Sequence, residues 1–121
     1  MEWRDLSPDE EQTLAAVIAL GAYRTFEGAD PSGVHALTGQ LIGLRAAPGA
    51  SAWQLALDPG ETTPVDLPDG PLPGRYFDGD GLDHEIVVSV TDGRLSGLEL
   101  VNHDGTTPTR WPTAETVRPW G

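Results

Sequence analysis

The fold of this chain is decided by its clearest alternating stretch, HEIVVSVTDGRLSGLELVN, which spans residues 84–102. Before Asp92-Gly93, apolar residues occupy every second position, a pattern typical of a strand with one buried face. Asp-Gly favours the two-residue turn that joins antiparallel strands. The sequence therefore predicts a β-hairpin with strands at about 84–91 and 94–103.

The second strand of this hairpin breaks the alternation, because Leu95 and Leu98 lie three residues apart. An unbroken ladder would place Glu99 on the buried face. One extra residue at Ser96-Gly97, a β-bulge, turns Glu99 to the opposite face, beside Glu85. The buried pairs predicted with this bulge are Leu95 with Val90, Leu98 with Val88, and Leu100 with Ile86.

Helix start signals precede the strands. Ser7-Pro8 followed by Glu10 is a capping box with proline at the first helical position. The same cap-then-proline signal recurs at Asp30-Pro31. Apolar residues at helical spacing follow both signals. The expected helices span about 8–20 and 31–40.

Three further strands are expected on weaker signals, at about 41–46, 52–57 and 74–78. The segment from Asp58 to Gly74 holds five prolines and is read as an irregular surface crossing. Its length makes it either functional or mobile. Helices grouped ahead of hairpin-linked strands favour an α+β fold over a parallel sheet. We expect one domain over 1–121, with two N-terminal helices packed on an antiparallel sheet of about five strands.

The composition is acidic, with a formal net charge of −12. Eleven carboxylates and two arginines lie between Asp58 and Asp104, which leaves −9 in that stretch. Such a field attracts cationic partners and repels nucleic acid and anionic membranes. The chain has no cysteine, which excludes disulfides and thiolate-bound zinc. A charged start and no apolar run long enough to span a bilayer predict a soluble, cytoplasmic protein.

Candidate catalytic and metal-binding residues are few. The segment Asp78–Glu85 has acidic side chains at alternating positions, as a calcium loop does. Leu82 stands where a third ligand belongs, so a Gly-Asp hairpin turn is the favoured interpretation. His35, His84 and His103 show no metal-binding spacing, and we expect the last two at strand ends as turn or surface residues. No nucleophile elbow or phosphate-binding loop occurs. We therefore expect no catalytic residue, metal or cofactor.

Two of the four tryptophans are candidates for packing or binding. Trp53 lies in an alternating segment and is expected in the core. Trp111 follows Arg110 and is either a core-edge residue or an interface anchor, since tryptophan beside arginine is a frequent binding hot spot.

Several segments resemble those of small, acidic actinobacterial proteins. They are Trp3–Glu11, Asp78–Gly81, and Asp92–Glu99 with the ending Thr109–Pro112. That group is similar to immunity proteins encoded beside polymorphic or contact-dependent toxins. The resemblance implies an α+β domain without enzymatic activity, and it transfers no catalytic residues.

The leading hypothesis is a non-enzymatic binding protein, an immunity protein that neutralises a toxin by occupying its basic surface. Complementary charge speeds the association of such pairs. The residues expected to contact the partner are Asp78, Asp80, Asp83, Glu85 and Asp104 through charge, and Trp111 as an apolar anchor.

Three alternatives to this hypothesis stay open. A metal-dependent or acid–base enzyme would use the segment Asp78–Glu85, including His84. A DNA-mimic inhibitor would present carboxylates in two rows at phosphate-like spacing. A charged face that only keeps the protein soluble also accounts for the composition. The identity of the partner and the oligomeric state are left open.

Overall fold

The computed structural model describes residues 2–23, 31–51, 53–72, 76–78, 84–102, 110–113 and 115–119. In this part of the chain, two α-helices and one 3-10 helix accompany a single sheet of eight antiparallel strands. The elements in chain order are β1 (Arg4–Asp5), α1 (Pro8–Tyr23), α2 (Pro31–Ala36), η1 (Leu37–Leu41), β2 (Arg45–Pro48), β3 (Gln54–Asp58), β4 (Gly70–Pro71), β5 (Tyr76–Asp78), β6 (His84–Thr91), β7 (Arg94–Asn102) and β8 (Val117–Pro119).

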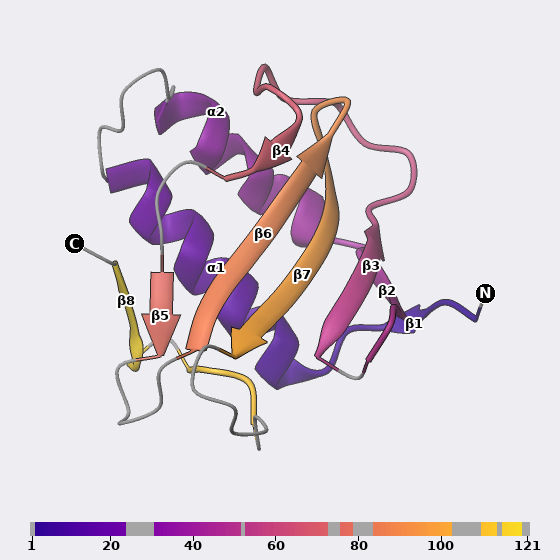
Figure 1. Cartoon of the computed structure of the whole chain (residues 1–121). Coiled ribbons are helices and arrows are strands. Elements are labelled where there is room, and N and C mark those ends of the chain that lie inside the picture. Colours follow the sequence, from indigo (N-terminus) through magenta and orange to yellow (C-terminus); the bar gives the residue numbers. More distant parts are fainter. Residues whose placement is uncertain are drawn as a thin grey trace.

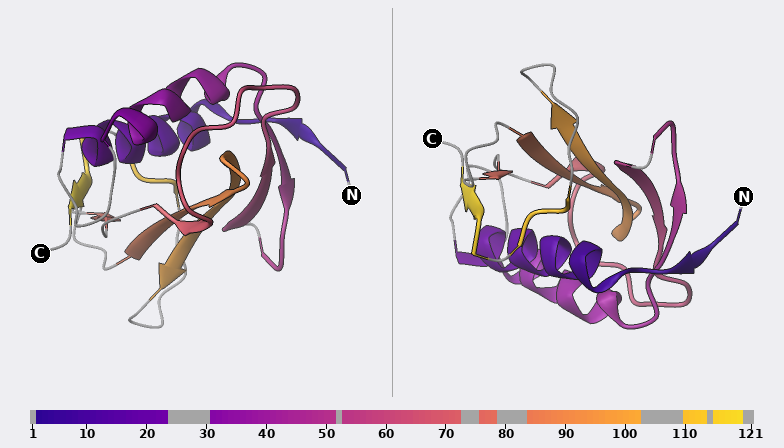
Figure 2. Two further views of the ribbon diagram at one scale, coloured as in Figure 1. Left: turned by 90° about the horizontal axis from the view of Figure 1, so that it is seen from above. Right: turned by 90° about the horizontal axis from the view of Figure 1, so that it is seen from below.

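The sheet curves around the helices. Its strand order is β1-β2-β3-β7-β6-β5-β8, and β4 pairs with β6. In Figure 1 the helices lie behind the sheet, and Figure 2 shows the sheet bending around the core while α1 and α2 close the open side. The core between these layers holds Leu14, Val17 and Ile18 of α1 against Val88, Leu98 and Leu100 of the sheet. The predicted α+β class with an antiparallel sheet is therefore confirmed.

The β6–β7 hairpin has the predicted register. Ser89 pairs with Gly97 and Val90 pairs with Leu95, so Ser96 is the extra residue of a β-bulge. Asp92 has φ 53° and Gly93 has φ 74°, as a turn that requires two left-handed residues demands. The three buried pairs are those expected, namely Val90 with Leu95, Val88 with Leu98, and Ile86 with Leu100.

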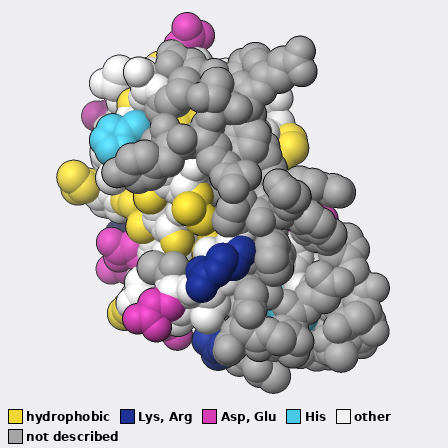
Figure 3. Space-filling view, turned by 90° about the vertical axis from the view of Figure 1, so that its left-hand side faces the viewer, with side chains coloured by type: hydrophobic (Ala, Val, Ile, Leu, Met, Phe, Trp, Pro, Cys, Tyr) yellow, Lys and Arg dark blue, Asp and Glu magenta, His cyan; other side chains and the backbone are white. Residues whose placement is uncertain are grey.

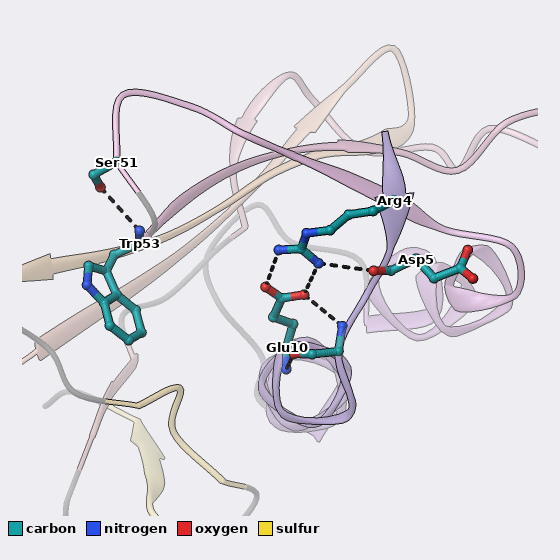
Figure 4. Close-up of polar contacts among 6 residues, drawn as sticks. Arg4, Asp5, Glu10, Ser51 and Trp53 are labelled. Carbon is teal, nitrogen blue, oxygen red and sulfur yellow. Dashed lines mark hydrogen bonds and ion pairs between the residues drawn. The ribbon is translucent and has the colours of Figure 1, made fainter. Parts of the chain in front are cut away.

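The start of α1 is the predicted capping box, with an added arginine. The N–H of Glu10 donates to Ser7 Oγ at 3.2 Å, and the N–H of Ser7 donates to Glu10 Oε1 at 2.8 Å. Arg4 donates to both oxygens of Glu10 at 2.8 Å, a bidentate pair that sequence reasoning missed (Figure 4). Burial alone raises the pKa of the Glu10 carboxyl, but the hydrogen bonds from Arg4 and Ser7 outweigh it, so this pKa lies below its ordinary value.

The second predicted helix is shorter and tighter than expected. The α-helical part ends at Ala36, and residues Leu37–Leu41 continue as a 3-10 helix. Glycines at 33 and 39 weaken an α-helix here by about 1 kcal/mol each relative to alanine. Gly43 follows with φ 77°, which delays the next strand to Arg45 instead of the predicted 41.

Three strands were not predicted, and each is only two or three residues long. β1 precedes α1, so the helices are not the first elements of the chain. β4 lies inside the expected irregular crossing, and β8 lies after Trp111, where no strand was expected. Strands this short carry no readable alternation, and their partners across the sheet define them.

The crossing between β3 and β5 is mostly irregular and exposed over residues 59–72, as expected, but it is also tied to the hairpin. The N–H of Val65 donates to the Gly93 carbonyl at 2.8 Å, and that of Leu72 donates to the Val88 carbonyl at 2.7 Å. The carboxylate of Asp69 accepts the Asp92 N–H at 2.8 Å. Over residues 58–72, at least one of the acidic side chains therefore serves the fold.

Candidate functional site

The side of the sheet away from the helices, here called the outer face, is the main candidate surface. Its central residues alternate in sequence with core residues and are all half-buried. No described helix lies over it, and Figure 1 shows this side turned toward the viewer. The outer face is formed by Gln54 and Ala56 of β3, Gly97, Glu99 and Val101 of β7, and Glu85, Val87 and Ser89 of β6.

A hollow of about 460 Å³ opens beside the bulge on the outer face. Ala56 and Gly97, which are register partners, bring little or no side chain to it. The φ of Gly97 is outside the left-handed region, and a Cβ there would meet nothing closer than 3.5 Å. Neither the backbone nor the packing therefore requires glycine at this position.

The polar side chains that line the hollow are Gln54, Ser89, Ser96 and Glu99. Gln54 Oε1 accepts the Ala50 N–H at 3.1 Å, and Thr91 Oγ1 donates to Ser96 Oγ at 3.0 Å. The half-buried carboxylate of Glu99 has no hydrogen-bond or ion-pair partner among the described residues. The lining contains no lysine, arginine or histidine, so its charge is negative, and its amide and hydroxyl groups can both accept and donate hydrogen bonds.

The structure places only part of the predicted contact set. Glu85 lies on the outer face, as expected. It pairs with Val101, and Glu99 pairs with Val87, two residues further along β6 and therefore on the same face. Asp78 is in β5, where its backbone pairs with Val117 of β8. Asp80, Asp83 and Asp104 lie outside the described residues.

Trp111 belongs to the core rather than to an open surface. It is 8% exposed and packs on Trp53, with ring centroids 5.4 Å apart and planes tilted by 55°. Trp53 is itself anchored, because its carbonyl accepts the Leu100 N–H at 2.9 Å and its N–H donates to Ser51 Oγ (Figure 4). Of the two interpretations of Trp111, its burial favours the core edge and leaves little of the ring for a partner.

His84 begins β6, as expected of a strand-end residue, but it is not on the surface. It is 1% exposed and shares the core face with Ile86. Neither ring nitrogen has a hydrogen-bond partner among the described residues. The expectation of a turn or surface position failed because the sheet end is covered, which the local sequence does not show.

A second hollow, of about 440 Å³, lies between the α2–η1 segment and residues 62–66. Its lining includes Gln40, whose side chain forms hydrogen bonds with the backbone of Gly93 and Leu95 at the hairpin turn. Part of the lining of this hollow therefore has a structural role. Among the described residues, no three potential metal ligands gather into a site, and no helix has the length and apolar character to cross a membrane.

One side of the molecule presents apolar and charged side chains together. On the side that faces left in Figure 1, hydrophobic side chains gather beside an arginine, with acidic side chains around them (Figure 3). The net charge of −12 is therefore compatible with local apolar contact area.

The residues that sequence reasoning missed are Gly97, Ala56 and Gln54. A strand glycine next to a predicted bulge was an available signal, because such glycines often mark a close approach of a ligand or another backbone. The pairing of β3 with β7, which brings the other two to the hollow, had no local signal. Comparisons with protein families, with curated proteins and with solved structures return no match for this chain.

Proposed function

We propose that this chain is a non-enzymatic binding protein that takes a basic protein domain on its outer face, as an immunity protein does when it neutralises a toxin. The observation that carries the proposal is Glu99, a half-buried carboxylate without a cationic partner among the described residues, on a sheet face that no described helix covers.

The energetics favour a cationic partner at this face. A carboxylate that loses part of its water without gaining a partner is costly, and an incoming guanidinium or ammonium group offsets that cost. Val87 and Val101 on the same face add apolar area, which supplies affinity. The net charge of −12 steers a basic domain toward the protein and raises the association rate.

The test is affinity capture from the native cell with three baits, followed by mass spectrometry. The baits are the wild-type chain, Glu99→Lys, and Glu61→Lys, which makes the same charge change at an exposed position off the outer face. We expect one basic protein on the wild-type and Glu61→Lys baits, and its loss from Glu99→Lys. Equal recovery on all three baits would overturn the assignment of the face.

Two follow-up measurements test the mechanism and the role. The association rate of the purified pair should fall as ionic strength rises, because screening shortens the reach of the field. Expression of the captured domain should arrest growth, and co-expression of this chain should restore it. A captured DNA-binding protein that duplex DNA displaces would support a DNA mimic instead. Heat of binding or a thermal shift with calcium, magnesium or zinc would support the metal-enzyme alternative.

A further inference from the structure

The floor of the hollow beside the bulge contains a glycine, Gly97, that neither its backbone conformation nor its neighbours require. A glycine in a strand interior lowers stability relative to alanine, because it has more backbone freedom to lose on folding. At Gly97 neither a left-handed φ nor a close neighbour demands glycine. Strand glycines often mark either a β-bulge, as at the neighbouring Ser96, or a site where another group approaches the backbone closely.

The chemistry of the walls matches a guanidinium group. Glu99 supplies a carboxylate, and Ser89, Ser96 and Gln54 add further acceptor oxygens around the same hollow. A guanidinium presents five donors in a flat fork, which suits one carboxylate with several neutral acceptors better than the point charge of lysine does. Its flat face also fits a floor that is bare backbone and one methyl group.

We infer that this hollow is the subsite for one arginine side chain of the basic partner, an inference that rests on the proposed function. The arginine enters over Gly97 and Ala56, and its guanidinium pairs with Glu99. At about 460 Å³ the hollow is larger than one side chain needs. It therefore also admits the backbone on either side of the arginine.

The test uses the full chain and three short peptides in an NMR titration of the backbone amides. The peptides are acetyl-Gly-Arg-Gly-amide and the same sequence with citrulline or lysine in place of arginine. We expect saturable shifts, in the millimolar range of concentration, at the amides of Ala56, Ser96, Gly97 and Glu99. Citrulline has the same shape without the charge and should bind at least tenfold more weakly, and lysine should bind severalfold more weakly.

Two variants close the hollow from different strands. Gly97→Val fills it from β7, and Ala56→Leu fills it from β3. If one variant fails to fold, the other still tests the subsite. Each should keep a dispersed amide spectrum and lose the saturable shifts. Glu99→Gln should keep the shape and weaken arginine binding at least tenfold. Glu61→Lys is the control and should bind the arginine peptide as the wild type does, within about twofold.

The outcomes separate the subsite from the proposed function. Shifts that do not saturate, that lie elsewhere, or that persist in both filled variants overturn the arginine subsite. If the captured protein still binds Gly97→Val and Ala56→Leu but not Glu99→Lys, the outer face stands and the subsite is wrong. If the arginine peptide binds as described but no basic protein is captured, the subsite stands and the proposed partner is wrong.

Discussion

Gln40 should be a main stabilising residue of this fold, and Gln40→Met tests that claim. The side chain is 2% exposed and reaches from η1 to the hairpin turn. Its amide group donates to the Gly93 carbonyl at 2.9 Å, and its Oε1 accepts the Leu95 N–H at 2.9 Å. Methionine has a similar length and no such partner groups, so the substitution removes the hydrogen bonds while retaining most of the packing.

The expected loss of unfolding free energy depends on which hydrogen bonds the backbone partners of Gln40 keep in the variant. The Gly93 carbonyl still accepts the Val65 N–H, so it loses one of two bonds. The Leu95 N–H loses the side-chain acceptor and is left unsatisfied, at a cost of about 1–3 kcal/mol. The Gln40 amide also donates to the Thr63 carbonyl at the longer distance of 3.3 Å. With about 1 kcal/mol for the lost bonds to the Gly93 and Thr63 carbonyls together, the free energy of unfolding should fall by about 2–4 kcal/mol.

Urea unfolding at equilibrium measures this loss, and a matched substitution controls for it. Gln12→Met makes the same chemical change at an exposed position of α1 and should stay within about 0.5 kcal/mol of the wild type. Hydrogen exchange of the Leu95 amide should also accelerate in Gln40→Met alone. Equal unfolding free energies for the two variants would refute the role assigned to Gln40.

Three other substitutions, the first with a matched control, test separate parts of the structure. Gly93→Ala should lower the free energy of unfolding by several kcal/mol, because a Cβ there would overlap a carbonyl oxygen of the crossing. Gly60→Ala is the control, since Gly60 also has a positive φ of 70° but open space around it, and it should cost about 1–2 kcal/mol. Similar losses for the two variants in urea unfolding would contradict the close approach at Gly93. Glu10→Gln should cost about 1 kcal/mol at neutral pH, discounted because Arg4 is half exposed. A lowered pKa means that the carboxylate stabilises the fold above its unfolded pKa and loses this effect as pH falls through the folded pKa. The difference in unfolding free energy between the wild type and Glu10→Gln should therefore shrink as pH falls below 4.5 and through the folded pKa. His84→Leu should leave stability unchanged or raise it by about 1 kcal/mol, since it removes two ring nitrogens without described partners; a marked loss in thermal unfolding would show that the ring has a structural role.

What the sequence by itself determined lies within short stretches. The capping box at Ser7 and Glu10 needs only residues three positions apart, so its signal is complete in the local sequence. The hairpin and its bulge follow from alternation on either side of Asp92-Gly93, because burying both strands on one face admits a single register.

The tertiary structure decided everything that depends on distant partners. Gln40 reads as an ordinary helix residue, and only the approach of Gly93 and Leu95, more than fifty residues away, gives it two backbone partners. Trp53 and Trp111 pair for the same reason, as does the tie between the crossing and the hairpin.

The candidate site likewise has features that the local sequence predicts and features that depend on distant partners. Sequence periodicity turned Glu99 and Glu85 to one face, because strand side chains alternate with a period of two. The hollow depends on β3 lying beside β7, so that Ala56 meets Gly97 and Gln54 meets Glu99. A single sequence records which way a side chain faces along its own strand. It does not record which strand lies alongside, because that choice minimises the free energy of the whole core.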